Sequence, residues 1–393
     1  MVRVRHQSHH EADRHEVDLS AWLDTLPMNL EAGERERLLV TAELVRTLAE
    51  GRGEDQHDWA LESDCFKAGL DVALILAELH VGIDCLVAGM LYRVVREKRI
   101  TIEEIETRFG IAVARLLQGV LKMAAIGDLR LQQDAPVLGQ AHAQKDNVRK
   151  MLIALVDDVR VALIKLAERT WAIRAVKDDE TRREPVAREV FVVYAPLAHR
   201  LGIGHLKWEL EDLSFRYIYA DAYRKIARLL DGKRLERDQF IAEVKELLSG
   251  VLRQAGLQFE IEGRAKHIYS IWRKMQRKGI GFSQVYDIRA VRILVPEIKD
   301  CYATLGLVHG LWRNIPNEFD DYIANPKENG YRSLHTGLIG PEGKILEVQS
   351  RTRQMHEEAE LGVCAHWRYK GSDAAYGMAS SYEEKIAWLR QVL

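Results

Sequence analysis

The feature that most constrains the fold is a change in the spacing of apolar residues near Gly256. From residue 19 to about residue 250, apolar side chains recur at helical spacing, as in Ala68–Leu79 and Met151–Val176, and this period predicts helices that bury one face. After Gly256, apolar and polar residues alternate, which predicts strands. The clearest helical stripe consists of Leu152, Leu155, Val156, Val159, Leu163 and Leu166. We therefore expect an all-α part followed by an α+β part.

The alternating segments after Gly256 predict a mixed sheet. They lie at Gln258–Glu262, Ile288–Leu294, Tyr331–Leu338 and Lys344–Arg351. The turn Gly340–Gly343 joins the last two segments into a hairpin. Helical patterns at His267–Arg277 and Lys299–Trp312 lie between the other segments. We expect a sheet that is covered by helices.

The expected domain organisation has five parts. They are a flexible N-terminus at 1–25, an all-α domain at 26–190, a helical connector at 191–255, an α+β domain at 256–375 and the start of a C-terminal helix at 376–393. Asp128–Gln144 is largely polar, so we expect a loop there. Pro185 and Pro196 mark the approach to a second helical stretch, Leu206–Leu252. Apolar runs are too short to cross a bilayer, and a signal peptide is lacking, so we expect a cytoplasmic protein with no membrane partner.

Two of the predicted strands carry carboxylates. Because side chains alternate along a strand, Asp287 and Arg289 share one face, and Glu347 and Gln349 share one face of another strand. If these polar faces coincide, Asp287 and Glu347 converge beside Arg289. Carboxylate oxygens suit Mg²⁺, which usually takes one or two of them and completes its shell with phosphates and water. The alternative is a solvated sheet face with surface ion pairs.

A cationic stripe follows the first predicted strand. Lys266, Ser270, Lys274 and Arg277 recur along one side of a helix that Gly263–His267 opens. The net charge of the chain is −2, so a phosphate site must be a local concentration of Lys and Arg. A helix N-terminus with such side chains can hold a triphosphate. The alternative is an ordinary wet helix face, and the sequence contains neither GxxxxGKS nor GxxxxGKT.

A turn in Asn325–Thr336 presents an aromatic side chain. Pro326 and Gly330 form the turn, and Tyr331 opens the following strand. Tyr331 can stack on a nucleobase, which contributes about 1–3 kcal/mol per base. Alternatively, its ring covers the edge of the core and leaves the hydroxyl in water.

The run from Tyr194 to Lys370 resembles the RelA/SpoT family of long alarmone synthetases. The matching segments read GRAKHIYSIWRKM, YDIRAVRI, NPKENGYRSLHT, EVQSRT and MHEEAELGVCAHW. The resemblance implies a nucleotidyltransferase-like synthetase domain that transfers the β,γ-pyrophosphate of ATP to the ribose 3′-hydroxyl of GDP or GTP. The implied products are AMP and the guanosine tetra- or pentaphosphate, ppGpp or pppGpp.

The resemblance also implies a role for each matched residue. Asp287 and Glu347 would hold Mg²⁺, and Glu347 would help to deprotonate the attacking hydroxyl. The implied ATP-binding residues are Arg264, Lys266, Ser270, Lys274, Arg277 and Arg289. The implied guanine-nucleotide residues are Lys327, Asn329, Tyr331, His335 and Gln349, with Tyr331 stacked on the base.

The acidic motif Glu318, Asp320 and Asp321 bears on specificity. Relatives that both synthesise and hydrolyse carry a basic version of this motif. The acidic version resembles that of RelA-type enzymes, which only synthesise, and it implies a different metal dependence and a preference for GDP. From the residues alone, we expect a charged loop.

Residues from about 30 to 190 resemble the family's HD hydrolase domain, which uses Mn²⁺ to remove the pyrophosphate. The positions of its metal-site residues hold Ala68, Tyr92, Arg93, Arg96, Glu97 and Glu168 in this sequence. Two arginines would repel a cation, and Glu97 and Glu168 alone would not hold it. We therefore expect a folded but inactive domain.

The resemblance implies three kinds of partner. These are ATP, GDP or GTP, and the ribosome with uncharged tRNA, which the family contacts through C-terminal regions that this sequence lacks, in the stringent response. One alternative is a bifunctional synthetase and hydrolase. Another is a ribosome-sensing or RNA-binding module without catalysis. A third is a template-independent nucleotidyltransferase, but those usually place two carboxylates two residues apart on a strand, whereas Arg289 follows Asp287 here.

Overall fold

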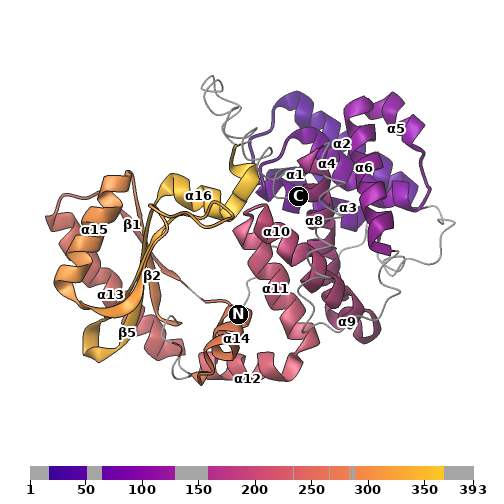
Figure 1. Cartoon of the computed structure of the whole chain (residues 1–393). Helices are drawn as coiled ribbons and strands as arrows, with labels where there is room; N and C mark the ends of the chain where they lie inside the picture. Colours follow the sequence, from indigo (N-terminus) through magenta and orange to yellow (C-terminus); the bar gives the residue numbers. More distant parts are fainter. Residues whose placement is uncertain are drawn as a thin grey trace. The chain divides into compact units, whose positions relative to one another are not determined.

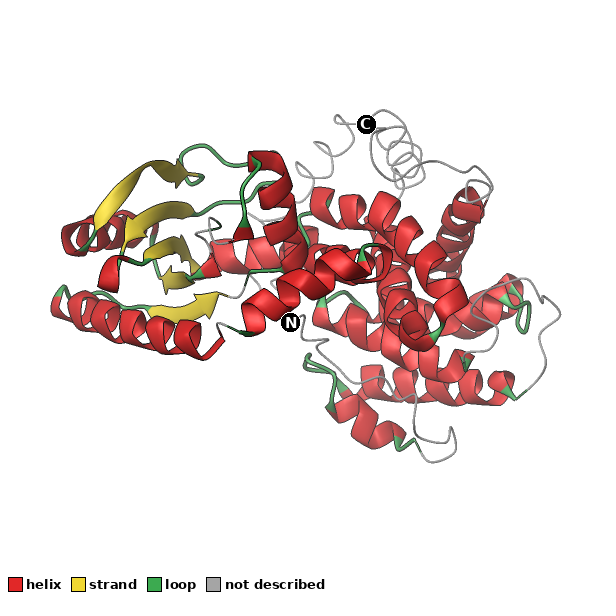
Figure 2. Cartoon of the chain, turned by 90° about the horizontal axis from the view of Figure 1, so that it is seen from below, coloured by secondary structure: helices red, strands yellow, loops and turns green. Residues whose placement is uncertain are grey.

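The structure is a computed structural model that describes residues 17–50, 64–128, 158–232, 234–264, 266–282, 285 and 288–366. These residues group into two units, one with residues 17–198 and 363–366 and the other with residues 199–362. All strands of the described residues belong to the second unit (Figure 2). The fold class expected from the sequence is confirmed. Asp287, residues 129–144 of the expected loop, and 376–393 lie outside the described residues.

The first unit is helical, as expected. Its helices are α1 (Leu19–Asp24), α2 (Ala32–Ala49), α3 (Cys65–Glu78), α4 (Ile83–Arg96), α5 (Ile102–Phe109), α6 (Ile111–Asp128), α8 (Val159–Ala175) and α9 (Glu180–Glu189). Side-chain caps fix their starts, since Asp64 accepts the Phe66 N–H at 3.0 Å and Thr101 forms a capping box with Glu104. Helix α1 buries Trp22, so part of the stretch expected to be flexible is helical.

Helix α8 differs from the expected one-sided stripe, because it is buried on every side. Its residues from Val161 to Ile173 are all buried, including the charged Lys165, Glu168 and Arg169. A helix that is surrounded by others has no polar face to expose. It contacts α3, α4, α6 and α9.

The two prolines expected to precede the next helical stretch lie inside helices instead. Pro185 is in α9, and Pro196 is in α10 (Ala195–Arg200). A π-helical turn, Val190–Tyr194, joins these helices, and the Ala195 N–H bonds to the Val190 carbonyl five residues back. Wider turns of this kind let a helix pass a proline that cannot donate its own hydrogen bond.

The second unit combines helices with one sheet. Its further helices are α11 (Gly204–Ile218), α12 (Ala220–Asp231), α13 (Arg234–Gln254), α14 (Ile268–Lys278), α15 (Ile298–Leu311) and α16 (Arg353–Leu361). Its strands are β1 (Glu260–Arg264), β2 (Ala290–Val295), β3 (Arg313–Asp321), β4 (Leu334–Ile339) and β5 (Ile345–Thr352). Their order is β1-β2-β5-β4-β3, with β2 and β5 parallel and the other pairs antiparallel.

Helices α13 and α15 cover one face of the sheet (Figure 1). Val291 and Ile293 of β2 pack there with Leu346 and Val348 of β5, as expected for the strand at 344–351. The opposite face, called the site face below, carries Glu347, Gln349 and Arg351, because side chains alternate along β5.

Strand β3 was not foreseen. The acidic residues expected in a charged loop lie in this edge strand, where Asp320 is opposite His335 and Phe319 is opposite Thr336. The strand is largely exposed and irregular, with a register shift before Phe319 and a positive φ of 65° at Asn317. Such an edge strand lacks the apolar alternation that identifies a half-buried one.

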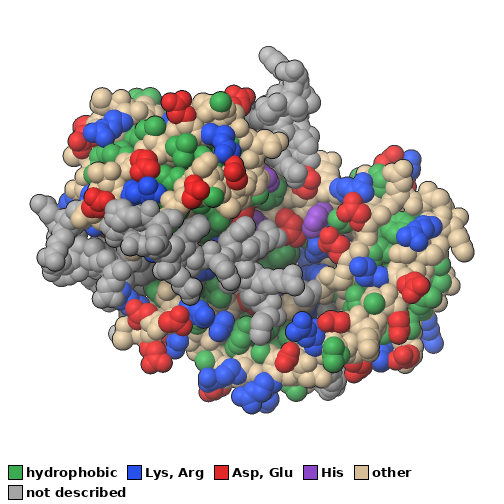
Figure 3. Space-filling view, turned by 180° about the vertical axis from the view of Figure 1, so that it is seen from behind, with side chains coloured by type: hydrophobic (Ala, Val, Ile, Leu, Met, Phe, Trp, Pro, Cys, Tyr) green, Lys and Arg blue, Asp and Glu red, His purple; other side chains and the backbone are tan. Residues whose placement is uncertain are grey.

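The described residues contain no helix that is long and apolar enough to span a membrane. Positive and negative side chains are interspersed on the face that Figure 3 displays, in keeping with a net charge of −2. A binding site for phosphates must therefore be a local feature of the structure.

Candidate active site

A cavity of about 540 Å³ lies between α14 and the site face of the sheet. Ten of the residues expected to form the site line it: Arg264, Lys266, Ser270, Lys274, Arg277, Glu318, Asp320, Lys327, His335 and Glu347. Among the described residues, its lining has eight Lys or Arg side chains and three carboxylates. The cavity therefore concentrates positive charge in a chain whose net charge is negative.

Four strands meet below the cavity in one row of residues. Arg264 of β1 is opposite Ala290 of β2, which is opposite Glu347 of β5, which is opposite Gly337 of β4. Ala290 and Gly337 are small, and Glu318 packs above Gly337, within 2.9 Å of where a Cβ would lie. Arg264 reaches across Ala290, and its Nη1 lies 3.8 Å from Glu347 Oε2.

The two oxygens of Glu347 have different surroundings. Oε1 accepts a 2.8 Å hydrogen bond from Gln349 Nε2 and lies 3.2 Å from His335 Nδ1. Oε2 is buried and accepts no hydrogen bond from the described residues. Burial would raise the pKa of Glu347, but the hydrogen bond from His335 and the charge of Arg264 outweigh it and keep this pKa below its ordinary value. Glu347 is therefore ionised at neutral pH.

Helix α14 carries Ser270, Lys274 and Arg277 of the expected stripe, with Ile268 and Ile271 buried on its other side, whereas Lys266 lies before the helix begins. Its N-terminus differs from the expectation. Asp212 of α11 accepts hydrogen bonds from the Tyr269 N–H at 2.8 Å and from the Ile268 N–H at 3.3 Å. The first amides of α14 are thus occupied by a carboxylate of the chain, so phosphates would meet the side chains of the stripe rather than the helix end.

Arg289 is not where the strand pattern placed it. It does not line the cavity. Its guanidinium lies 3.5 Å from Glu236 and 5.7 Å from the centre of the Phe240 ring, both in α13 on the covered face of the sheet. Arg289 therefore does not share the face of the sheet that carries Glu347, contrary to the expectation. Strand pairing begins only at Ala290, which takes the place beside Glu347.

The residues expected to hold the guanine nucleotide are only partly brought together. Lys327 and His335 line the cavity, whereas Asn329, Tyr331 and Gln349 do not. The Asn329 amide lies 3.3 Å from His199 Nδ1, and its oxygen accepts the Tyr331 N–H at 3.3 Å. Gln349 is fully buried against Glu347.

The Tyr331 ring lies among charged and aromatic groups. The Lys327 ammonium is 5.3 Å and the Arg351 guanidinium 5.7 Å from the ring centre. Arg351 is fully buried, whereas Lys327 is exposed. A base that stacks on Tyr331 would therefore displace Lys327 rather than Arg351.

Several lining residues were missed or undervalued. Tyr322 lines the cavity, with Lys327 Nζ 4.1 Å from its ring centre, and burial raises the pKa of Tyr322 to about 12. Its place directly after the acidic motif was a signal that could have revealed it. Lys207 of α11 also lines the cavity, with Arg273 and Lys278 of α14. Nothing near Lys207 in the sequence indicates this, because α11 meets the cavity only through tertiary packing.

The acidic residues of β3 divide between two environments. Glu318 and Asp320 line the cavity, and Glu318 lies 3.2 Å from Lys278. Asp321 does not line it; this carboxylate accepts a 3.0 Å hydrogen bond from the Tyr302 hydroxyl. Two of the three residues are thus placed to affect what binds in the cavity.

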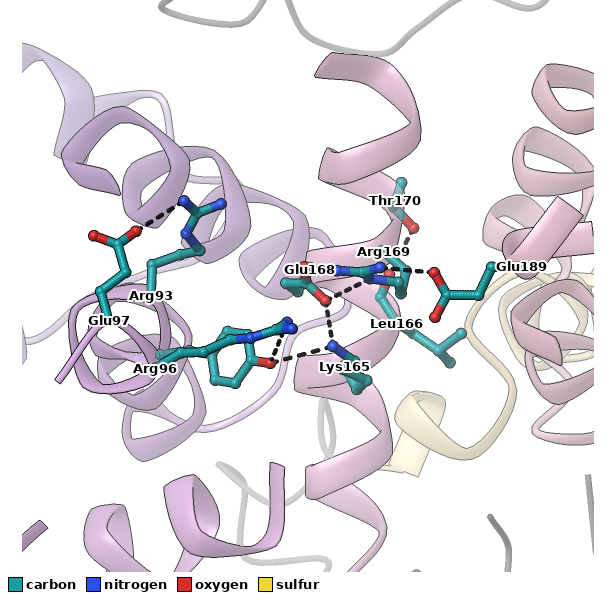
Figure 4. A network of polar contacts seen from close by, with 10 residues as sticks. Arg93, Arg96, Glu97, Lys165, Leu166, Glu168, Arg169, Thr170 and Glu189 are labelled. Carbon is teal, nitrogen blue, oxygen red and sulfur yellow. Dashed lines mark hydrogen bonds and ion pairs between the residues drawn. The ribbon is translucent and has the colours of Figure 1, made fainter. Parts of the chain in front are cut away.

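The positions expected to have lost a metal lie in the helical unit, where Figure 4 shows most of them. Ala68 is fully buried and offers no ligand atom. The Tyr92 hydroxyl lies 3.2 Å from Lys165 Nζ and 3.3 Å from Arg96 Nη1. Arg93 donates to Glu97 at 2.9 Å. The described residues contain no cluster of three or more His, Cys, Asp or Glu that could hold a metal ion.

Glu168 is surrounded by cations of the protein itself. Lys165 Nζ lies 2.8 Å from Glu168 Oε2, and Arg169 bonds to Glu168 and to Glu189. Burial would raise the pKa of Glu168, but the charges of Arg169 and Lys165 lower it below its ordinary value. Lys165 and Glu168 are 2% and 1% exposed, and a buried charge of this kind is tolerated only when it is paired.

Comparison with known proteins adds independent information. Residues 263–374 match the region found in RelA / SpoT proteins, and residues 43–204 match an HD domain. The chain is 49% identical over 327 residues to a GTP pyrophosphokinase of Photobacterium angustum and 48% identical over 326 residues to one of Escherichia coli. These matches cover 83% of this chain but 43% of each relative, so the chain spans less than half of their length.

Among solved structures, the small alarmone synthetase 1 from Bacillus subtilis matches 43% of this chain and 90% of its own. The identity is 23% and the TM-score is 0.31. This likeness is too weak to support a conclusion.

Proposed function

We propose, because this chain belongs to the RelA/SpoT family, that residues 199–362 transfer the β,γ-pyrophosphate of ATP to the 3′-hydroxyl of GDP or GTP. The products would be AMP and ppGpp or pppGpp. The observation that carries this proposal is the cavity that faces the cationic stripe of α14 on one side and the ionised Glu347 on the other.

The stripe suits a triphosphate because several positive side chains line the same cavity. Lys266, Lys274 and Arg277 line the cavity with Ser270 between them. Transfer of a phosphoryl-type group depends on positioning and charge neutralisation more than on covalent catalysis. We propose that these side chains hold the ATP phosphates, with Arg264 at the end nearest to Glu347.

The reaction would form one bond and break another. The 3′-oxygen attacks the β-phosphorus of ATP, and the bond from this phosphorus to the oxygen of the α-phosphate breaks, so AMP leaves. The hydroxyl proton would pass to the Glu347 carboxylate or to solvent.

The donor set at Glu347 fits Mg²⁺. This carboxylate is ionised, and one buried oxygen accepts no hydrogen bond from the described residues. Mg²⁺ needs only one or two protein carboxylates when phosphates and water complete its shell. We propose Glu347 as one ligand and retain Asp287, which lies outside the described residues, as the other. The ion would neutralise charge that develops on the transferred phosphates.

We propose that the guanine nucleotide binds next to Lys327, His335 and Tyr322, with the base stacked on Tyr331 after Lys327 moves aside. Lys327 is exposed, so its movement costs little. Glu318 and Asp320 would repel a further negative charge in the cavity. That repulsion supports a preference for GDP, which carries one phosphate fewer than GTP.

A second proposal is that the helical unit does not hydrolyse the product. Its support is the ion-pair network in which Lys165 and Arg169 neutralise Glu168. Arg93 likewise neutralises Glu97. An added Mn²⁺ would have to displace these cations from Glu168 and Glu97, which would leave their buried positive charge less well neutralised. We therefore propose that the protein makes ppGpp or pppGpp but does not hydrolyse them. The proposed setting is the stringent response, with the ribosome and uncharged tRNA as partners.

One set of incubations tests both proposals. The full chain with ATP, Mg²⁺ and GDP or GTP should yield AMP and a 3′-pyrophosphorylated guanosine in equal amounts. No product in the presence of either acceptor would refute the synthetase proposal. The full chain with ppGpp and Mn²⁺ should release no pyrophosphate, and release would instead support a bifunctional enzyme.

A further inference from the structure

Three side chains of the site face form a continuous hydrogen-bonded chain. His335 Nδ1 lies 3.2 Å from Glu347 Oε1, and His335 Nε2 lies 2.9 Å from the Tyr331 hydroxyl. The two ring nitrogens of one imidazole therefore contact a carboxylate on one side and a phenol on the other. No other described side chain bridges the turn that holds Tyr331 to Glu347 in this way.

The partners fix which nitrogen of His335 carries the proton. An ionised carboxylate can only accept, so Nδ1 must donate to Glu347. In the neutral imidazole, Nε2 then has a lone pair, and the Tyr331 hydroxyl donates to it. The chain of bonds runs in one direction, from the Tyr331 O–H through His335 to Glu347.

Packing holds the imidazole in this orientation. The Tyr331 and Tyr322 rings both meet it edge-on, with interplanar angles of 86° and 87° and centroid distances of 5.8 and 5.3 Å. Across the sheet, His335 is opposite Gln349, whose amide donates to the same Oε1 of Glu347. Two donors thus lie at Oε1, whereas Oε2 accepts no hydrogen bond from the described residues and lies near Arg264.

We propose that His335 is a positioning residue that joins Tyr331 to Glu347, so that the aromatic ring and the reactive carboxylate oxygen are oriented by one imidazole. This inference rests on the proposed function, because it assigns a purpose to Oε2. It differs from the expectation that His335 only lines the nucleotide pocket. In the proposed role, His335 acts through Glu347 and does not need to contact a nucleotide.

The first test reads the bond pattern without any turnover. Selective ¹⁵N labelling of histidine and two-bond nitrogen–proton correlations in the nucleotide-free full chain should show His335 as the neutral Nδ1–H form, assigned by its loss in His335→Gln. Tyr331→Phe keeps the ring but removes the hydroxyl, so only the Nε2 resonance of His335 should shift strongly. An Nε2–H form, or no shift in Tyr331→Phe, would overturn the proposal.

The second test separates the two bonds kinetically. The amide nitrogen of Asn can replace Nδ1, and that of Gln can replace Nε2, so His335→Asn keeps the donor to Glu347 and His335→Gln loses it. His335→Gln should lower kcat by about 10–100-fold, as loss of a group that orients a metal ligand does. His335→Asn should retain kcat within about threefold of wild type and raise KM for the guanine nucleotide, because Tyr331 loses its partner.

The matched control is His309, whose Nε2 lies 2.9 Å from Thr336 Oγ1, the residue next to His335 in β4. His309→Gln should leave kcat and KM unchanged. Equal increases of KM with unchanged kcat in both His335 variants would mean direct nucleotide contact and would overturn the proposal. If the wild-type chain shows no synthesis, the proposed function fails, but the resonance pattern still decides whether the bonded chain exists.

Discussion

Asp212 of α11 accepts a 2.8 Å hydrogen bond from the Tyr269 N–H and so holds the start of α14. The carboxylate is 1% exposed, and it also accepts the Ile268 N–H. These are two of the amides that a helix leaves open at its start. The helix that carries the cationic stripe is therefore anchored by a residue far back in the sequence.

We predict that Asp212→Ala lowers the free energy of unfolding by about 1–3 kcal/mol, because buried amides lose their acceptor. Asp212→Asn keeps an acceptor oxygen and should lose less. Urea unfolding of the full chain, followed by circular dichroism, measures both. The exposed Asp221→Ala is the control and should change stability by less than about 0.5 kcal/mol. Equal losses for the Ala and Asn variants would argue against the cap.

Glu347→Gln should lower the rate of AMP formation by at least about 10²–10³-fold, because Oε2 and its charge are lost. The fold should persist, since an amide can still accept from His335. Initial rates with ATP and GDP measure the effect. Glu342→Gln, in the turn before β5, removes a carboxylate that does not line the cavity and should keep the wild-type rate. A Glu347→Gln rate within tenfold of wild type would remove Glu347 from the reaction.

Arg264 and Arg289 were both expected to bind ATP, but only Arg264 lines the cavity. We predict that Arg264→Gln raises KM for ATP by about tenfold or more, because a charge-assisted contact is worth more than 1.4 kcal/mol. Arg289→Gln breaks a partly exposed pair with Glu236 and a contact with the Phe240 ring, both away from the cavity lining, and should change KM by less than about twofold. Steady-state kinetics with ATP as the varied substrate measures both KM values. A similar increase of KM in the two variants would support the expectation that both arginines bind ATP.

The sequence could predict features that depend on a regular period. The alternation in β5 places Glu347 and Gln349 on one face, and the helical period in α14 gathers Ser270 and Lys274. Both follow from backbone geometry alone. The same holds for the all-α unit and for the mixed sheet, whose apolar patterns are long and consistent.

Other features depend on contacts that no local pattern records. Alternation places Arg289 on the same face of β2 as Val291 and Ile293, but it does not show that α13 covers this face. The cap from Asp212 on α14 and the arrival of Lys207 at the cavity need the tertiary fold. In α8, the apolar stripe did not show that Glu168 is buried too, together with its counterions.

Glu168→Gln should destabilise the helical unit by about 3–5 kcal/mol, because Lys165 and Arg169 lose the charge that pairs with them in the interior. The exposed Glu184→Gln breaks an i,i+4 pair with Arg188 and should cost less than about 0.5 kcal/mol. Urea unfolding and hydrogen exchange of α8 measure the difference. A loss as small as that of the control would mean that the network is not needed for stability.

The stability difference between wild type and Glu168→Gln should depend on pH in a defined direction. The folded-state pKa of Glu168 is lower than its ordinary value of 4.5, so its contribution is fully present above that value. The contribution is lost as the pH falls through the lower, folded-state pKa. The stability difference between wild type and Glu168→Gln should therefore be constant between about pH 6 and 8. It should shrink only below about pH 4, and a decline near pH 6 would contradict the assignment.

Two glycines of the sheet-containing unit should respond oppositely to the same substitution. A Cβ at Gly204, at the start of α11, would lie 2.3 Å from the Ala359 carbonyl oxygen, so α11 and α16 approach too closely for a side chain. Gly250 in α13 has nothing within 4 Å of such a Cβ. We predict that Gly204→Ala lowers the free energy of unfolding by about 1–3 kcal/mol through forced displacement. Gly250→Ala should raise it by about 0.4–1 kcal/mol, because alanine restricts the unfolded chain and favours a helix.

Urea unfolding of the two variants measures both changes, and each variant serves as the control of the other, because each adds one methyl group. Gly204→Ala should also lower synthesis, since α16 packs against β5, which carries Glu347. Gly250→Ala should not, because α13 lies on the covered face of the sheet. If Gly204→Ala were as stable and as active as wild type, α11 and α16 could not be in the close contact on which the shape of the site face depends.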